Sequence, residues 1–298
     1  MISGYLVTVL ITIGIYVILA LSLNVITGYA GQISLGHAAF MGIGAYTSAV
    51  LFTKAGVAFW PAFLLAGLVA GVVGAVLAIP CLRVREDFLA ITTMGINFVV
   101  EAVFLYIPFF GAGMGIGGIS LPSVFGREIT KPEFLVLVFG LILAVIAVDR
   151  WVSRSWIGLG WSAIREDEDA ASAMGIDVVR FKVLAFALGS AGAGLAGSLY
   201  AHFLTFIMPV NFGFNQSIVI LSMVVFGGIG TLRGPIFGAI FLGALPEVSR
   251  PVMEYRTLLY GVLLLLLMRY QPDGVLGDHS LLLRGWNTLR KQVVPIKN

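Results

Sequence analysis

The sequence contains little charge. Only 11% of its 298 residues are Asp, Glu, Lys or Arg, whereas 59% are hydrophobic and the mean hydropathy is +1.02. Soluble domains carry about 25% charged residues, so this composition excludes an ordinary soluble domain and indicates a chain dissolved in lipid. The balance of 18 basic against 15 acidic residues is too even to suggest a nucleic-acid partner.

Residues for covalent or metal chemistry are also scarce. The single cysteine, Cys81, rules out an intrachain disulfide. His37, His202 and His279 are scattered and no H-E-x-x-H motif occurs, so we expect no metal site and no catalytic residues. A Walker A motif is missing too, because none of the five lysines follows a glycine. We therefore expect this chain to bind no cofactor and to be no enzyme.

Long apolar runs dominate what is present. A helix needs roughly 20 apolar residues to cross about 30 Å of hydrocarbon, and the sequence predicts nine such spans, with eight to ten allowed because glycines blur several boundaries. No segment alternates like a barrel strand. We expect an all-α, polytopic transmembrane bundle over residues 1–278 and a basic tail over 279–298. The predicted spans are 5–26, 36–53, 59–80, 88–109, 134–149, 183–204, 215–229, 234–249 and 256–269.

The basic residues predict the orientation. No Lys or Arg precedes the first apolar run, unlike the start of a signal peptide, so we expect that run to be a retained transmembrane helix. Assigning alternate loops to one side places 13 of the 18 basic residues together and 5 on the other side. The richer side is expected to be cytoplasmic and to hold the C-terminus. The basic tail is expected to contact anionic lipid.

One apparent nucleotide motif is interpreted as helix packing. The run Gly192–Gly197 matches G-x-G-x-x-G, but it lies in an apolar stretch without the preceding strand that dinucleotide binding needs. Small residues at intervals of four allow helices to approach closely. Two such faces are present: Gly189, Ala193 and Gly197, and Ser190, Gly194 and Ser198.

The longest predicted cytoplasmic loop, 150–182, contains a short predicted helix from Ser162 to Met174. Its early turns hold four consecutive acids, 166–169, which suit the positive end of a helix dipole. Gly175 is expected to end this helix and Asp177 to cap the next one. Two interpretations stay open here. The helix is either a solvated surface element or one placed to receive movement from a cytoplasmic partner.

Longer blocks of sequence resemble a known family. The run Asp169–Gly175 (D-A-A-S-A-M-G) resembles the E-A-A-x-x-x-G coupling motif of ABC importer permeases, with Asp in place of Glu. In order and content, several blocks resemble the branched-chain amino acid ABC permease family, M-type subunit. Together they sample about residues 16–278. The blocks are 19–46, 82–95, 163–186 and 223–235, followed by 271–277.

The resemblance implies a permease subunit of an ABC importer in a bacterial or archaeal inner membrane, with branched-chain, aliphatic amino acids as cargo. Implied partners are a second related permease, two cytoplasmic ATPases that bind ATP and magnesium, and a periplasmic or lipid-anchored binding protein. Two departures from the family pattern, in Asn97–Glu101 and Gly111–Gly118, leave urea, amides or another small solute open as cargo. The implied ATPase-coupling residues are Arg165, Glu166, Asp167, Asp169, Ala170, Ala171 and Gly175.

Three polar residues in the fourth predicted span are candidates to line the transport pathway. Thr93, Asn97 and Glu101 lie four residues apart and so share one helix face. A carboxylate inside the membrane costs at least ~2.5 kcal/mol unless it is paired or hydrated, so this face should look into the bundle or a pathway. A hydrogen bond to a neighbouring helix is the alternative. Glu101 also allows a rival hypothesis, a proton-coupled secondary transporter.

Three more pathway candidates lie around a glycine-rich break. Asn24, Gln32 and His37 flank or fall within Gly28–Gly36, where a discontinuous helix could expose backbone groups to a cavity. For His37, a packed histidine with satisfied hydrogen bonds is the alternative. A second glycine-rich interruption, Gly227–Gly234, has a loosely similar glycine spacing.

Overall fold

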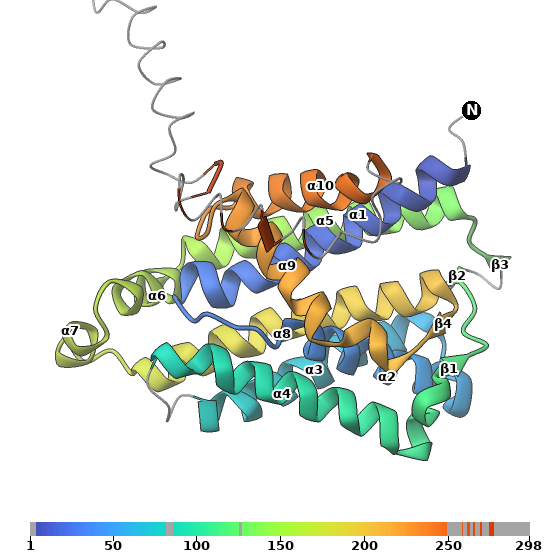
Figure 1. The fold of residues 1–298 in the computed structure, drawn as a ribbon, viewed down its shortest axis with the longest axis horizontal. Helices are drawn as coiled ribbons and strands as arrows, with labels where there is room; N and C mark the ends of the chain where they lie inside the picture. Colours follow the sequence, from blue (N-terminus) through green and yellow to red (C-terminus); the bar gives the residue numbers. More distant parts are fainter. Residues whose placement is uncertain are drawn as a thin grey trace, which may run out of the picture.

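The computed structural model describes residues 4–81, 86–124 and 127–248, with a few isolated positions between 258 and 276. Within these residues the chain is almost entirely helical (Figure 1). The strands described there form two short antiparallel pairs, so the predicted all-α membrane fold is confirmed. The pairs are β1 (Ile116–Gly117) with β4 (Phe206–Ile207), and β2 (Ser123–Val124) with β3 (Arg127–Glu128).

Six helical stretches of the described chain are long and apolar enough to cross a membrane. They match six of the nine predicted spans, because uninterrupted apolar runs of this length favour a helix whose backbone is fully hydrogen-bonded in lipid. They are α1 (Gly4–Asn24) continued by η1 (Val25–Tyr29), α3 (Phe59–Cys81), α4 (Glu86–Tyr106), α5 (Lys131–Ser153), α8 (Val178–Leu204), and η4 (Pro209–Phe212) followed by α9 (Phe214–Gly227).

The other three predicted spans differ. The span predicted at 36–53 is the helix α2 (His37–Ala55), but its polar residues and glycines leave it outside the six most apolar stretches. The span predicted at 234–249 is α10 (Arg233–Val248), with 16 residues, too short to be counted as spanning. The span predicted at 256–269 lies mostly outside the described residues.

Helix α8 occupies the middle of the bundle and makes its largest contacts with α3 and α2. Small residues make this possible. A Cβ placed on Gly194 would lie 2.7 Å from Ala66 O, and one on Gly71 would lie 3.1 Å from Ala187 O. Larger side chains at these glycines would force the helices apart, so the G-x-G-x-x-G run serves helix packing, as predicted.

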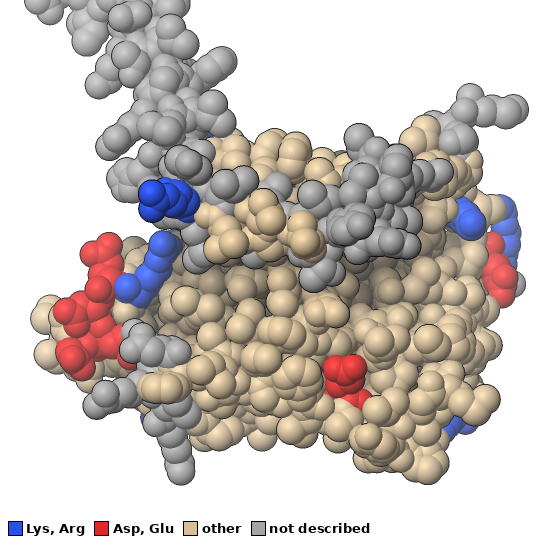
Figure 2. Space-filling model, viewed as in Figure 1, with Lys and Arg blue, Asp and Glu red and all other residues tan. Residues whose placement is uncertain are grey.

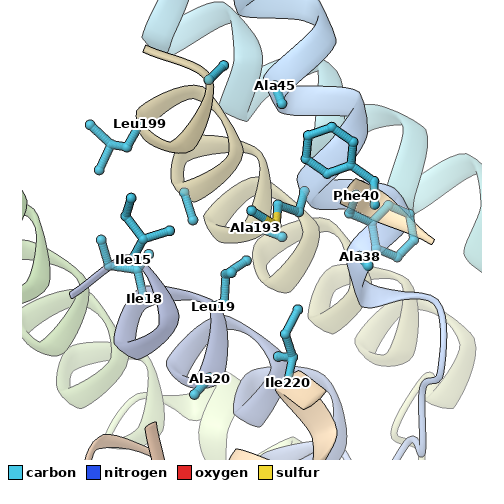
Figure 3. Packing of buried hydrophobic residues seen from close by; sticks show 14 of the residues in the cluster. Ile15, Ile18, Leu19, Ala20, Ala38, Phe40, Ala45, Ala193, Leu199 and Ile220 are labelled. Carbon is cyan, nitrogen blue, oxygen red and sulfur yellow. The ribbon is translucent and has the colours of Figure 1, made fainter. Parts of the chain in front are cut away.

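The apolar core lies where α1, α2, α8 and α9 meet (Figure 3). Leu19, Phe40, Ala193 and Ile220, one from each of these helices, are all at most 1% exposed. Lipid is as apolar as leucine, so exclusion of water contributes little to helix association inside a membrane. Close packing and its dispersion attraction therefore hold these helices together.

Charged residues gather at the two ends of the molecule, and the face between them is nearly uncharged (Figure 2). The helices α6 (Trp156–Glu166) and α7 (Glu168–Ala173) lie at one end, and the short strands lie at the other end near the N-terminus (Figure 1). An uncharged belt between two charged ends is the arrangement expected of a protein that crosses a membrane.

One helix prediction was wrong. A single helix was expected from Ser162 to Met174, but the structure has two, because the chain is extended at Asp167 (φ −161°). The Asp167 carboxylate accepts a hydrogen bond from Ala170 N at 2.9 Å and so caps α7. An aspartate that can cap a new helix competes with continuing the old one. The two acids that follow, Glu168 and Asp169, then occupy the first turn of α7.

Candidate functional site

The break between α1 and α2 is present where the sequence predicted it, at Gly28–Gly36. Helix α1 ends in the π-helical turn η1, and the chain then runs without helix from Ala30 to Gly36. Thr27 Oγ1 donates to Gln32 O at 3.1 Å, and Gln32 N donates to Ile26 O at 3.0 Å. These bonds fold the break back against the end of α1.

Asn24 joins this break to the loop between α9 and α10. Its Oδ1 accepts a hydrogen bond from Gly230 N at 2.9 Å, and its Nδ2 donates to Thr231 O at 3.1 Å. The side chain is fully buried, so both ends of the amide are used inside the protein. The two glycine-rich interruptions noted in the sequence therefore meet in space, and Asn24 holds them together.

His37 lies at the start of α2 and is fully buried. Its Nε2 is 2.9 Å from Ser22 Oγ, and the neighbouring Ala38 N donates to Ser217 Oγ at 3.0 Å. Gln32 is also buried, with 2% exposure. Both residues thus lie inside the helix packing around the break, and neither is on an open surface of the chain.

The polar face of α4 faces inward, toward the break and α9. Thr93 Oγ1 accepts a hydrogen bond from Leu35 N at 2.9 Å. Asn97 Nδ2 donates to Phe212 O at 3.2 Å, and its Oδ1 accepts from Ser217 Oγ at 2.9 Å. Thr93 and Asn97 are both buried, so these two pathway candidates bond to neighbouring segments.

Glu101, one helical turn further along α4, is the pathway candidate that is partly exposed. A Cβ on Gly213 would lie 3.0 Å from Glu101 Oε2, so the carboxylate rests against the residue that precedes α9. The N-terminus of a helix carries a partial positive charge that favours a nearby carboxylate. Figure 2 shows acidic atoms over α4 in an otherwise uncharged face. Of the six candidates, Glu101 is thus the one that keeps part of its surface outside the helix packing.

The predicted coupling residues lie together on α6, α7 and the turn that follows. Ala171 faces inward with 4% exposure, whereas the other six lie on the surface. Gly175 has a positive φ of 86° and ends α7, and Asp177 Oδ1 accepts a hydrogen bond from Arg180 N at 3.1 Å at the start of α8, both as predicted. Met174 is 84% exposed beside them. Met174 was not among the predicted coupling residues, although it lies within the Asp169–Gly175 motif and an exposed methionine is a usable signal for a contact surface.

Two contacts that sequence reasoning missed hold α6 and α7 against α8. Glu168 pairs with Lys182, whose side chain is buried. Trp161 Nε1 donates to Phe181 O at 2.8 Å. No local pattern predicts either contact, because the partners lie on different helices, with all of α7 between Trp161 and Phe181, and tertiary packing brings them together.

Arg165 connects this end of the chain to the turn that ends α1. Its Nη1 donates to Gly28 O, within η1, at 2.7 Å. A cavity of 300 Å³ adjoins it, lined by Thr27 and Gly31 from the break and by Glu166 and Asp167 from the junction of α6 and α7, among others. The predicted coupling residues on α6 and the break are therefore in direct contact.

The chain is similar in sequence to known transport proteins. The family described as "Branched-chain amino acid transport system / permease component" matches residues 5–268. The chain belongs to this permease family. It is thus a multi-pass membrane transport protein of the ABC permease type, as the resemblance implied.

Several relatives carry matching names. The high-affinity branched-chain amino acid transport system permease protein LivM of Salmonella typhimurium is 35% identical over 288 residues, 88% of this chain and 68% of that protein. The probable branched-chain amino acid transport permease protein LivM of Methanocaldococcus jannaschii is 25% identical, over 92% of this chain and 94% of that protein. LivH of Escherichia coli, also a high-affinity branched-chain amino acid transport system permease protein, is 25% identical over 88% and 91%. No solved structure matches the chain.

Proposed function

We propose that this permease is a subunit of an ATP-driven importer that carries branched-chain, aliphatic amino acids into the cell. The names of its relatives support branched-chain amino acids as the cargo. One structural observation supports coupling of the bundle to the ATPases. The α6–α7 pair lies at a charged end of the bundle, and Arg165 donates a hydrogen bond from this pair to the turn that ends α1. Movement applied to that pair reaches a membrane-spanning helix directly.

The partners follow from the same proposal. A second, related permease completes the pathway, in line with relatives of both LivM and LivH type. Two ATPases bind ATP and magnesium at the α6–α7 end, so that this chain needs no cofactor of its own and hydrolyses no ATP. A periplasmic or lipid-anchored binding protein delivers the cargo at the other end. The α6–α7 end and the basic tail after residue 278 are then cytoplasmic.

In this mechanism the helical bundle has two conformations, and nucleotide bound to the ATPases shifts the equilibrium between them. ATP binding closes the ATPase pair, the closure displaces α6 and α7, and the break between α1 and α2 changes its position relative to α9. The helices α3 and α8 move as one block because their backbones are in close contact. A surface of mainly apolar side chains then suits an aliphatic amino acid, and Glu101 offers its passing ammonium group a carboxylate.

Two alternatives remain to be tested against this function. Urea, amides or another small solute would use the same machine, and transport assays with each compound decide between them. The partly exposed Glu101 within a membrane span favours a second candidate, a proton-coupled secondary transporter. That candidate requires uptake by this chain without ATPases, and it requires Glu101→Gln to abolish that uptake.

The docking experiment compares two methionines of equal exposure at opposite ends of the molecule. Met174, beside α7, is 84% exposed and Met114, beside the short strands, is 85% exposed. The chain is co-expressed with candidate ATPases and purified by its own tag, and the ATPase retained per chain is measured. Met174→Asp is expected to reduce it about tenfold, because docking would bury an unpaired charge, while Met114→Asp retains the wild-type amount. Equal retention by both variants, or no ATPase on the wild type, contradicts the proposal.

A further inference from the structure

Arg165 lies among three glycines that come from two distant segments. It donates to Gly28 O at 2.7 Å. A Cβ on Gly31 would lie 3.2 Å from Arg165 Cγ, and a Cβ on Gly230 would overlap Arg165 Nη1. Gly31 and Gly230 both have positive φ, 71° and 80°. The arginine side chain thus runs between the α1–α2 break on one side and the α9–α10 loop on the other.

The glycines are needed for this arrangement on two grounds. Positive φ values disfavour residues with a side chain, and the space that a side chain would occupy is taken by the arginine. Gly28 adds a third contact, because a Cβ there would lie 2.7 Å from Gly230 N. The glycine-rich segments at 28–36 and 227–234 therefore do more than interrupt helices. They make room for one charged side chain that comes from α6.

The turn η1 is held from other sides as well. Asn24, just before it, bonds the α9–α10 loop through Gly230 N and Thr231 O. Tyr29, at its end, donates from its hydroxyl to Asp149 Oδ2 on α5 at 3.2 Å. Among the described hydrogen bonds, the one from Arg165 is the link between η1 and the α6–α7 pair. A π-helical turn is an irregular segment that often marks a functional position in a helix.

We propose that Arg165 is a positioning residue that passes the movement of α6 and α7 to η1 and the α9–α10 loop. The inference rests on the proposed function and names the contact through which its coupling acts. A hydrogen bond from a guanidinium to a carbonyl is strong and directional, and Gly31 and Gly230 lie against the same side chain. Displacement of α6 therefore moves both segments together.

The test uses the full complex in proteoliposomes and three readouts: ATPase retained per permease, ATP hydrolysis, and leucine uptake. Arg165→Gln shortens the side chain and removes its charge. We expect retained ATPase and hydrolysis to stay within about twofold of wild type, and uptake per ATP hydrolysed to fall by about tenfold, the effect of losing one charged hydrogen bond. Arg165→Lys, which keeps a charged donor, restores part of the uptake. Arg180→Gln is the control, because Arg180 lies at the same end with its side chain 87% exposed.

A second pair of variants leaves the arginine in place. Gly31→Ala crowds Arg165, whereas Gly56→Ala has the same left-handed backbone (φ 63°) with nothing within 4 Å. We expect uptake per ATP to fall in Gly31→Ala and to hold in Gly56→Ala. This pair decides the matter if Arg165→Gln fails to accumulate in the membrane.

Three outcomes overturn the inference. The first is an uptake per ATP that is the same for Arg165→Gln and Arg180→Gln. The second is loss of the ATPases from Arg165→Gln, which would mean that Arg165 acts in docking. The third is an uptake per ATP that is the same for Gly31→Ala and Gly56→Ala. Failure of the proposed function is a different result, since the wild-type chain would then retain no ATPase at all.

Discussion

Glycines act differently in two regions of this molecule. Between α3 and α8, Gly71, Gly74 and Gly194 lie within regular helices and bring two backbones into contact. Around Arg165, Gly31 and Gly230 lie between helices, have positive φ and accommodate a long charged side chain. The first region joins helices into a block. The second separates the ends of helices and connects them again through a few polar contacts.

The two regions also differ in how they are stabilised. The α3–α8 contact is a sum of many small dispersion terms over its whole length, so no single contact controls it. The junction around Arg165, where the α1–α2 break meets the α9–α10 loop, depends on a few identifiable hydrogen bonds that Asn24, Thr27 and Arg165 make. A membrane protein that changes conformation can move where a few hydrogen bonds set the geometry. It stays rigid where close packing sets the geometry.

The largest effect is expected from crowding the helix contact. Gly194→Leu places a large side chain where even a Cβ would lie 2.7 Å from Ala66 O. We expect the loss of most folded protein, because overpacking costs about 1–3 kcal/mol or more, measured as monodisperse protein after detergent extraction. Gly140→Leu on α5 is the control, since nothing lies within 4 Å of a Cβ there. Similar yields of the two variants would mean that α3 and α8 do not form a rigid block.

A smaller effect is expected at the junction. Asn24→Ala removes both bonds to the α9–α10 loop and leaves Gly230 N and Thr231 O without that partner. We expect a loss of about 2 kcal/mol in stability, seen as a lower thermal midpoint, together with reduced uptake. Asn215→Ala, on the exposed surface of α9, is expected to change neither. An unchanged thermal midpoint for Asn24→Ala would show that the two glycine-rich segments do not depend on this link.

The smallest effect is expected where a glycine has positive φ and no neighbour. Gly175, after α7, has a φ of 86° and nothing within 4 Å of a Cβ. Gly175→Ala is expected to cost only the backbone strain, about 1 kcal/mol, with retained ATPase and uptake per ATP near wild type. Thermal unfolding and the transport assay check this directly. A large loss of uptake per ATP would show that strain alone disturbs coupling, and would weaken the argument from Gly31 and Arg165.

The sequence predicted much of the fold, because hydropathy over 20 residues is a local property. Six spans, the helix-packing role of Gly192–Gly197 and the break at Gly28–Gly36 all follow from short stretches of sequence. The prediction of a single helix at 162–174 was wrong because the Asp167 side chain caps a new helix. Capping by that one side chain competes with continuation of the first helix. Composition does not decide that competition.

The junction itself was beyond local reasoning. Arg165 and Gly28 are 137 residues apart, and Asn24 and Gly230 are 206 apart. Glycine spacing indicated that both interrupted segments were unusual, but it carried no information on which side chain lies between them. Of the six pathway candidates, five proved to be buried, and four of these five bond to neighbouring segments through their side chains: Asn24, His37, Thr93 and Asn97. Their roles in transport remain predictions.

The measurement that tests the central claim most directly is leucine uptake into proteoliposomes. One set holds this chain with the second permease, the two ATPases and the binding protein, and another holds this chain alone. We predict accumulation in the first set only when ATP is supplied on the ATPase side and the binding protein on the other, with no uptake in the second set. Uptake by the chain alone, driven by a proton gradient and abolished by Glu101→Gln, would contradict the account.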